Sequence, residues 1–231
     1  MKKTNTKAEV VYHRLKQKII SFKLLPGEMI NENRVAELFN VSRTPVREAL
    51  RQLTNEGFLL EKAGKLYVYE LSVQDIMEIF EVREALERKA IQLLNKECLH
   101  MLVKKLKDKN KRMHQLLIEE DYEGFFEADD HFHKLIVNNC ENNKITEILH
   151  KFNVQVGRVR YLTILSEHRM KSTIDEHVAV IDAIEKEDLN KAAIAMSKHI
   201  HAVQKTIRQF SNLTTLLHSG LEGILTVKKI P

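Results

Sequence analysis

The stretch NENRVAELFNVSRTPVREALRQLTNEG, residues 31–57, decides the fold of the N-terminal part of this chain. It predicts two short helices joined by a tight turn at Asn40, because asparagine is the best non-glycine residue for a left-handed backbone. Ser42 is then the expected N-cap of the second helix. Pro45 falls in the first turn of that helix, where its missing N–H is one that the helix leaves unpaired anyway.

The two helices separate their polar and apolar residues onto different faces. The inward residues of the first are expected to be Val35, Leu38 and Phe39. Those of the second are expected to be Val46, Ala49, Leu50 and Leu53. Arg43, Thr44 and Arg47 lie elsewhere on the second helix and are free to face a partner. A helix that packs on a core through one face and has a polar, cationic N-terminal end suits the major groove of DNA.

The flanking segments complete a winged helix-turn-helix. A helical apolar stripe predicts a first helix from about Glu9 to Phe22, and Met29-Ile30 can form a short strand. Gly57 is placed to end the recognition helix, and residues 58–69 predict a hairpin with a basic, glycine-containing tip. The alternative is an ordinary small α+β domain with a solvated basic face.

The charge of the chain is concentrated in this segment. Its 231 residues carry a formal net charge of +5. Residues 1–71 hold 13 Lys and Arg against 8 Glu, whereas residues 72–231 are balanced. That basic excess is typical of a nucleic-acid-binding module. No apolar run approaches the roughly 18 residues of a membrane span, no secretory signal is present, and the isolated Cys98 and Cys140 favour a cytoplasmic setting.

The motif described above resembles the winged helix of GntR-family transcription regulators. The likeness covers roughly residues 8–71 and is densest from Val41 to Gly57. It implies DNA contacts by Arg34, Ser42, Arg43, Thr44, Arg47 and Gly64. Arg43 and Arg47 can each donate a bidentate pair of hydrogen bonds to guanine, whereas the hydroxyls of Ser42 and Thr44 suit phosphate oxygens. Asn40 departs from the family, which often has glycine there.

From Ser72 onward the sequence predicts an all-α domain. Residues 72–219 contain two glycines, no proline and no alternating strand pattern, so six or seven helices in an antiparallel bundle are expected. The fold class is therefore mainly α, with a winged helix-turn-helix over residues 1–71 and a helical bundle over residues 72–231.

Three helices of this domain carry polar residues on their apolar faces. Asp129 and His133 share a face at i, i+4, so both can ligate one ion. His177 and His199 are equidistant from the turn at Asp188, so they should face each other across a helical hairpin. The stripe that carries His177 is expected to consist of Ile174, Val178, Ile181 and Ile184. Three imidazoles and one carboxylate favour a transition-metal site, although any single histidine could be a hydrogen-bonded core residue.

The same region resembles the FCD effector domain, which marks the FadR-type branch of the GntR family. The likeness spans about residues 73–210 and rests on the patterns DDHFHKLI, EHVAVIDAI and AAIAMSKHI. Many members hold a divalent metal, here Zn, Ni, Mn or Fe, that presents open positions to a small carboxylate. The implied ligands are Asp129, His133, His177 and His199.

Arg83 matches an arginine common in that branch, which implies pairing with an effector carboxylate; the alternative is a surface salt bridge. Arg160 is a weaker candidate for the same role. Residues 211–231 lie beyond the resemblance, and no function is inferred for them.

These patterns favour a bacterial transcription regulator that binds palindromic double-stranded operator DNA as a homodimer and senses a metal-held organic acid. One rival is a metal-dependent hydrolase with an appended nucleic-acid-binding domain, because a His₃Asp site can activate water. No further general base stands beside the ligands in the sequence. The second rival is a structural DNA-binding protein that has no effector.

Overall fold

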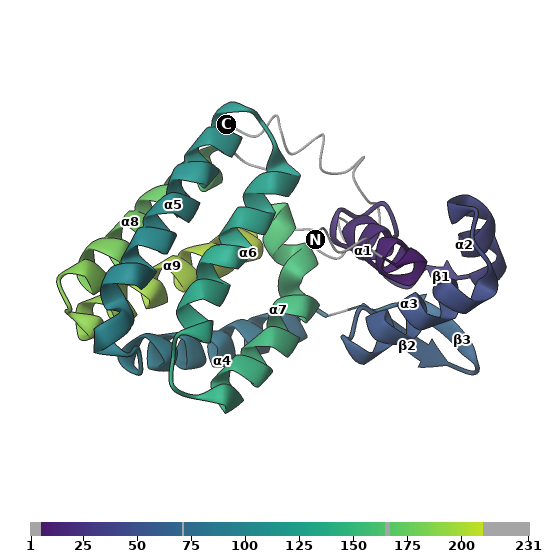
Figure 1. The fold of residues 1–231 in the computed structure, drawn as a ribbon, viewed down its shortest axis with the longest axis horizontal. Helices are drawn as coiled ribbons and strands as arrows, with labels where there is room; N and C mark the ends of the chain where they lie inside the picture. Colours follow the sequence, from purple (N-terminus) through teal and green to yellow (C-terminus); the bar gives the residue numbers. More distant parts are fainter. Residues whose placement is uncertain (1–5, 71, 165–166, 210–231) are drawn as a thin grey trace. The chain divides into compact units, whose positions relative to one another are not determined.

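The computed structural model describes residues 6–70, 72–164 and 167–209, which form two compact units divided between Ser72 and Val73. Both units are mainly helical, and the first also contains a small sheet, so the predicted fold class is confirmed (Figure 1). Within the described part of the chain, no helix is long and apolar enough to cross a membrane. Residues 211–231 lie outside the described residues.

The first unit is a winged helix-turn-helix. Its elements are α1 (Lys7–Ile20), β1 (Met29–Ile30), α2 (Glu32–Phe39), α3 (Arg43–Asn55), β2 (Leu59–Lys62) and β3 (Lys65–Val68). The strands form an antiparallel sheet in the order β1-β3-β2, with Met29 opposite Tyr67 and Leu59 opposite Val68. Helices α1 and α2 pack on α3, and β2 and β3 form the predicted wing (Figure 1).

Local backbone chemistry sets the ends of α2 and α3. The Asn31 side chain accepts two hydrogen bonds from backbone N–H groups in the first turn of α2. Asn40 has a φ of 50°, the predicted left-handed conformation, and Gly57 after α3 has a φ of 83°. Ser42 occupies the predicted N-cap position of α3, but its hydroxyl makes no capping hydrogen bond.

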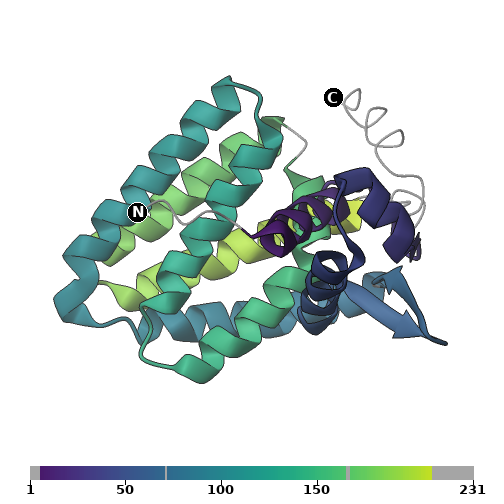
Figure 2. The same cartoon turned by 45° about the vertical axis from the view of Figure 1, so that its right-hand side comes forward.

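The second unit is a bundle of helices packed in a closed circuit. Its elements are α4 (Val73–Gln92), a 3₁₀ turn (Lys96–Cys98), α5 (Leu99–Ile118), α6 (Tyr122–Asn138), α7 (Asn143–Thr163), α8 (Glu167–Glu185) and α9 (Leu189–Gln209). Each α-helix packs on the next in the order α4, α9, α8, α5, α6, α7 and back to α4 (Figures 1 and 2). The circuit has one shared interior, into which α6, α8 and α9 direct side chains.

Two of the predicted buried positions were wrong. Leu38 is 62% exposed, because the short helix α2 buries only a narrow stripe around Val35. Val178 is 42% exposed, because it lines an open hollow between α5 and α8 instead of packing under another helix. The predicted inward face of α3 is confirmed.

The left-handed turn yields the first prediction. Asn40→Val should destabilise the first unit by about 1–2 kcal/mol, because a β-branched residue is disfavoured at positive φ. Asn40 is exposed, so the substitution removes no core packing. Amide hydrogen exchange of α3 in the full chain measures the loss. Asn40→Gly, the matched control, should keep or raise protection, and equal protection in Asn40→Val would contradict the assignment.

Candidate functional site

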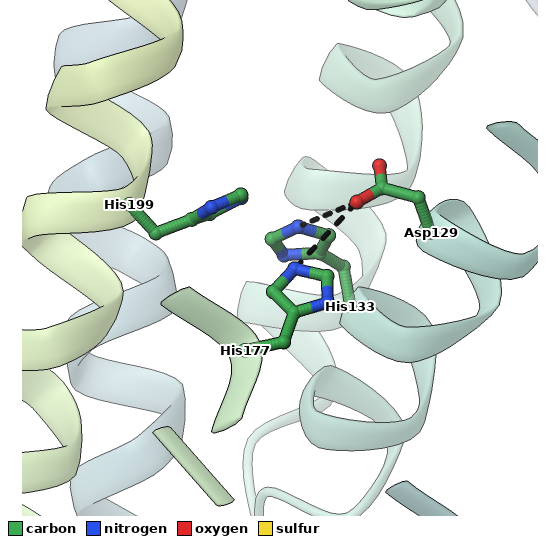
Figure 3. A group of neighbouring side chains, drawn as sticks. All are labelled: Asp129, His133, His177 and His199. Atoms are coloured by element: carbon green, nitrogen blue, oxygen red, sulfur yellow. Dashed lines mark ion pairs between the residues drawn. The ribbon is translucent and has the colours of Figure 1, made fainter. Parts of the chain in front are cut away.

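Four predicted ligand residues meet in the interior of the helical unit. Asp129 and His133 come from α6, His177 from α8 and His199 from α9 (Figure 3). One ligand atom from each lies within 4.8 Å of the others, and none of the residues is more than 5% exposed. The imidazole centroids of His177 and His199 are 4.8 Å apart, as expected of residues equidistant from the turn. Asp188 caps α9 beside that turn through the Lys191 N–H, at 2.9 Å.

Asp129 presents a carboxylate oxygen to imidazole nitrogens that lack hydrogen-bond partners. Its Oδ1 lies 3.6 Å from His177 Nε2 and 3.9 Å from His133 Nε2, too far for good hydrogen bonds (Figure 3). His133 Nε2 and both ring nitrogens of His177 are buried and unpaired. Because buried polar atoms are normally paired, a cation between these nitrogens and the carboxylate would complete the arrangement.

The size and donor chemistry of this cluster fit a transition-metal ion. Zinc binds imidazole nitrogen and carboxylate oxygen at about 2.0–2.2 Å, which puts the ligand atoms of one ion roughly 3–4 Å apart. The ligand atoms of the cluster need only small side-chain adjustments to reach that spacing. Three nitrogen donors and one oxygen donor also suit Ni, Mn and Fe, so the donor set does not select one metal.

Electrostatics favour the protonation states that metal binding requires. Burial raises the pKa of Asp129, but the nearby Arg160 and the histidines lower this pKa more, so it lies well below its ordinary value. Burial lowers the pKa of both His177 and His199, and the neighbouring histidines lower these pKa values further. At neutral pH the carboxylate is therefore ionised and these imidazoles are neutral, as a cation needs.

Arg160, on α7, binds the other carboxylate oxygen of Asp129. Its Nη2 donates to Asp129 Oδ2 at 2.5 Å, and its Nη1 lies 3.4 Å from Asp130 Oδ1. The Arg160 side chain is buried, so this ion pair supplies the counter-charge that keeps Asp129 ionised inside the protein.

Arg83, on α4, lies in the core, so the alternative of a surface salt bridge is wrong. It is 1% exposed, its Nε donates to Glu87 Oε1 at 2.6 Å, and one of its terminal nitrogens, Nη2, has no partner. It lines a cavity of about 10 Å³ beside the cluster, close to the volume of one water. The cavity lining consists of Arg83, Asp129, Arg160, Thr163, Ile164, Thr173, His199, Ile200 and Val203.

Sequence reasoning missed two carboxylates that contact the histidines. His133 Nδ1 is 2.6 Å from Glu87 Oε2, and His199 Nδ1 is 2.7 Å from Glu176 Oε2. Glu87 had a signal, because it follows Arg83 by four residues on the buried stripe of α4. No sequence signal marked Glu176. It is half-buried, lies next to His177 on α8, and contacts a histidine on a different helix, α9.

The residues predicted to contact DNA all lie on the surface of the first unit. They are Arg34 on α2, Ser42, Arg43, Thr44 and Arg47 at the start of α3, and Gly64 between β2 and β3. Gly64 has a φ of 70° and open space around it, so the wing tip is unobstructed. Arg47 Nε lies 2.9 Å from Glu32 Oε2, but this exposed ion pair is weak and leaves the guanidinium available.

A winged helix joined to a helical bundle is the arrangement of a DNA-binding transcription regulator with a second, helical domain. Residues 7–65 match bacterial regulatory proteins of the gntR family, and residues 78–202 match the FCD domain. The chain belongs to the GntR family of bacterial transcription regulators and has the FadR-type combination of domains.

Relatives and a solved structure extend this likeness over most of the chain. The uncharacterized HTH-type transcriptional regulator YdhC of Bacillus subtilis strain 168 is 30% identical over 195 residues, 82% of this chain and 86% of YdhC. The gluconate operon transcriptional repressor of the same strain is 29% identical over 232 residues, 96% of this chain and 93% of the repressor.

The structure of McbR/YncC from E. coli matches with a TM-score of 0.73 at 20% identity, over 90% of this chain and 100% of that one, and supports the fold. The relatives are transcription regulators, so the chain is a regulator and not the hydrolase of the alternative hypothesis.

The buried ion pair yields the second prediction. Arg160→Met should destabilise the metal-free helical unit by about 3–5 kcal/mol, because Asp129 loses its buried counter-charge. Urea unfolding of the full chain in the presence of a chelator measures the change. The control is the double variant Asp129→Asn/Arg160→Met, which should lose less because it leaves no lone charge. A single variant as stable as wild type would rule out this role for the pair.

Proposed function

We propose that this regulator binds palindromic operator DNA as a homodimer, and that a divalent metal and a small carboxylate bound in the helical unit control that binding. Residues 1–71 would form the DNA-binding domain and residues 72–231 the metal- and effector-binding domain. One observation supports metal binding most directly. A carboxylate and three imidazoles meet in the buried interior, and several of the imidazole nitrogens have no hydrogen-bond partner.

The chain's own residues supply the metal-binding part of the site. Asp129, His133, His177 and His199 would hold the ion, which is Zn, Ni, Mn or Fe. When bound, the ion would act as a Lewis acid to which a carboxylate can bind. Arg160 holds the Asp129 carboxylate in place, and burial keeps His177 and His199 neutral.

The cavity beside the cluster favours a small organic acid as the effector. Arg83 lines this cavity and its Nη2 has no hydrogen-bond partner, and a guanidinium N–H is a strong donor to a carboxylate. Ile164 and Val203 limit the size of the occupant. The family includes a relative named as the repressor of the gluconate operon, and gluconate is a small hydroxy acid.

The size of that cavity supports a coupling mechanism. At about 10 Å³ it holds about one water, so an organic acid must displace side chains or helices that line it. One of these helices is α4, whose first residue, Val73, follows the winged-helix unit directly in the chain. A displacement of α4 would change the placement of the DNA-binding domain, with a coupling free energy of about 1–3 kcal/mol.

The DNA-binding role of particular residues rests on their chemistry and exposure. The contacts would come from Arg34, Ser42, Arg43, Thr44, Arg47 and Gly64. Arg43 and Arg47 would read guanine, whereas the Ser42 hydroxyl, which makes no capping bond, would bind phosphate. One recognition helix per chain requires two chains to read a palindrome, hence the homodimer.

The third prediction tests DNA recognition. Arg47→Ala should weaken operator binding by about 5–150-fold, which corresponds to the 1–3 kcal/mol of one bidentate hydrogen-bonded contact to a base. Gel-shift titration with the promoter region of its own gene measures the affinity. Arg112→Ala, which removes an exposed arginine from α5, should bind like wild type. Sequence-independent binding by the wild type would overturn the proposed operator recognition.

The fourth prediction tests the metal ligands. His177→Ala should lower the metal content of the purified protein below one ion per chain, because it removes a buried donor. Elemental analysis measures the content, and metal-free DNA binding should stay near normal. His131→Ala is the matched control, because this exposed histidine lies two residues from His133. Unchanged metal in His177→Ala would show that the ligand assignment is wrong.

A further inference from the structure

Glu87 connects Arg83 to His133 inside the helical unit. Glu87 Oε1 accepts a hydrogen bond from Arg83 Nε at 2.6 Å, and Glu87 Oε2 lies 2.6 Å from His133 Nδ1. The side chains of all three are no more than 2% exposed. Both carboxylate oxygens of Glu87 are therefore engaged by buried side chains from two different helices.

Glu176 connects Arg169 to His199 in the same way. Arg169 Nη1 and Nη2 donate to the two carboxylate oxygens of Glu176 at 2.8 and 2.5 Å. Glu176 Oε2 in turn lies 2.7 Å from His199 Nδ1. This second set lies on α8 and α9, whereas the first lies on α4 and α6, so the two sets share no residue.

His177 is held differently from these two histidines. Its ring stacks on that of Phe132, with centroids 3.7 Å apart and planes 4° from parallel. Both of its ring nitrogens are unpaired. A carboxylate on Nδ1 is therefore a specific feature of His133 and His199, not a general consequence of burial in this unit.

We propose that Glu87 and Glu176, each anchored by a buried arginine, are positioning residues that orient His133 and His199 for the metal. This inference rests on the proposed metal site. A carboxylate that accepts a hydrogen bond from the Nδ1–H of a histidine fixes the neutral tautomer whose Nε2 lone pair is free to bind a cation. The same hydrogen bond raises the basicity of the imidazole and fixes its plane.

The arginines have a defined part in this arrangement. A carboxylate buried beside a neutral imidazole needs a counter-charge, and the guanidinium supplies it while limiting the carboxylate to one orientation. Arg83 uses Nε for this purpose, which leaves its Nη2 without a hydrogen-bond partner, and the same residue lines the cavity proposed for the effector. One guanidinium thus contacts both the support of a metal ligand and the effector cavity.

The test is the Zn²⁺ affinity of the full chain, measured by competition with a chromogenic chelator. Glu87→Gln and Glu176→Gln should each bind Zn²⁺ about 10–100-fold more weakly than wild type, the usual loss for such a partner. Glu81→Gln on α4 and Asp175→Asn on α8 are matched controls, because both remove an exposed carboxylate near the residue tested. Their affinity should equal that of wild type.

Two further measurements separate positioning from a general loss of structure. With chelator present, Glu176→Gln should keep the helical circular-dichroism spectrum of Asp175→Asn and unfold cooperatively, although at a lower temperature because Arg169 loses its counter-charge. The visible spectrum of bound Co²⁺ should shift in the Glu87 and Glu176 variants and stay unchanged in the controls. If Glu87→Gln does not fold, Glu176→Gln decides the result.

Wild-type affinity in the folded Glu→Gln variants would overturn this inference and leave the metal site standing. Absence of Zn²⁺ binding by the wild-type chain would overturn the metal site, and the inference with it.

Discussion

Asp129 places a negative charge in the interior of the helical unit, and the surrounding side chains are arranged to keep it there. Leaving such a charge unpaired costs several kcal/mol, because water is lost and no counter-charge replaces it. Arg160 supplies that counter-charge through one carboxylate oxygen, while the other oxygen faces His133 and His177. Two further buried arginines of this unit, Arg83 and Arg169, are likewise paired with carboxylates.

The two units use charge in opposite ways. On the winged helix, Arg43 and Arg47 are exposed, so they can exchange water for phosphates and bases at little cost. In the helical unit, Arg83 and Arg160 are buried and committed to carboxylates. The net charge of +5 in residues 1–71 therefore belongs to a surface that attracts a polyanion, whereas buried charges of the helical unit are matched in pairs.

Sequence reasoning succeeded where the controlling physics is local. The left-handed Asn40, the cap position of Ser42 and the shared face of Asp129 and His133 all follow from backbone preferences and helical spacing. It failed for Leu38 and Val178, because periodicity predicts the centre of a buried face but not its width. The width depends on which neighbouring helices cover the face, and local sequence does not contain that information.

The sequence by itself predicted the winged helix with its basic recognition helix and the four candidate ligand residues, because each depends on spacings within one or two elements. Only the tertiary structure decided that Glu87 contacts His133, 46 residues away, and that Arg160 pairs with Asp129, 31 residues away. Such pairs form where separate helices pack against each other, and the rotation of one helix against another is set by the whole interior. The unpaired nitrogens of His177 likewise became visible only once every neighbour was in place.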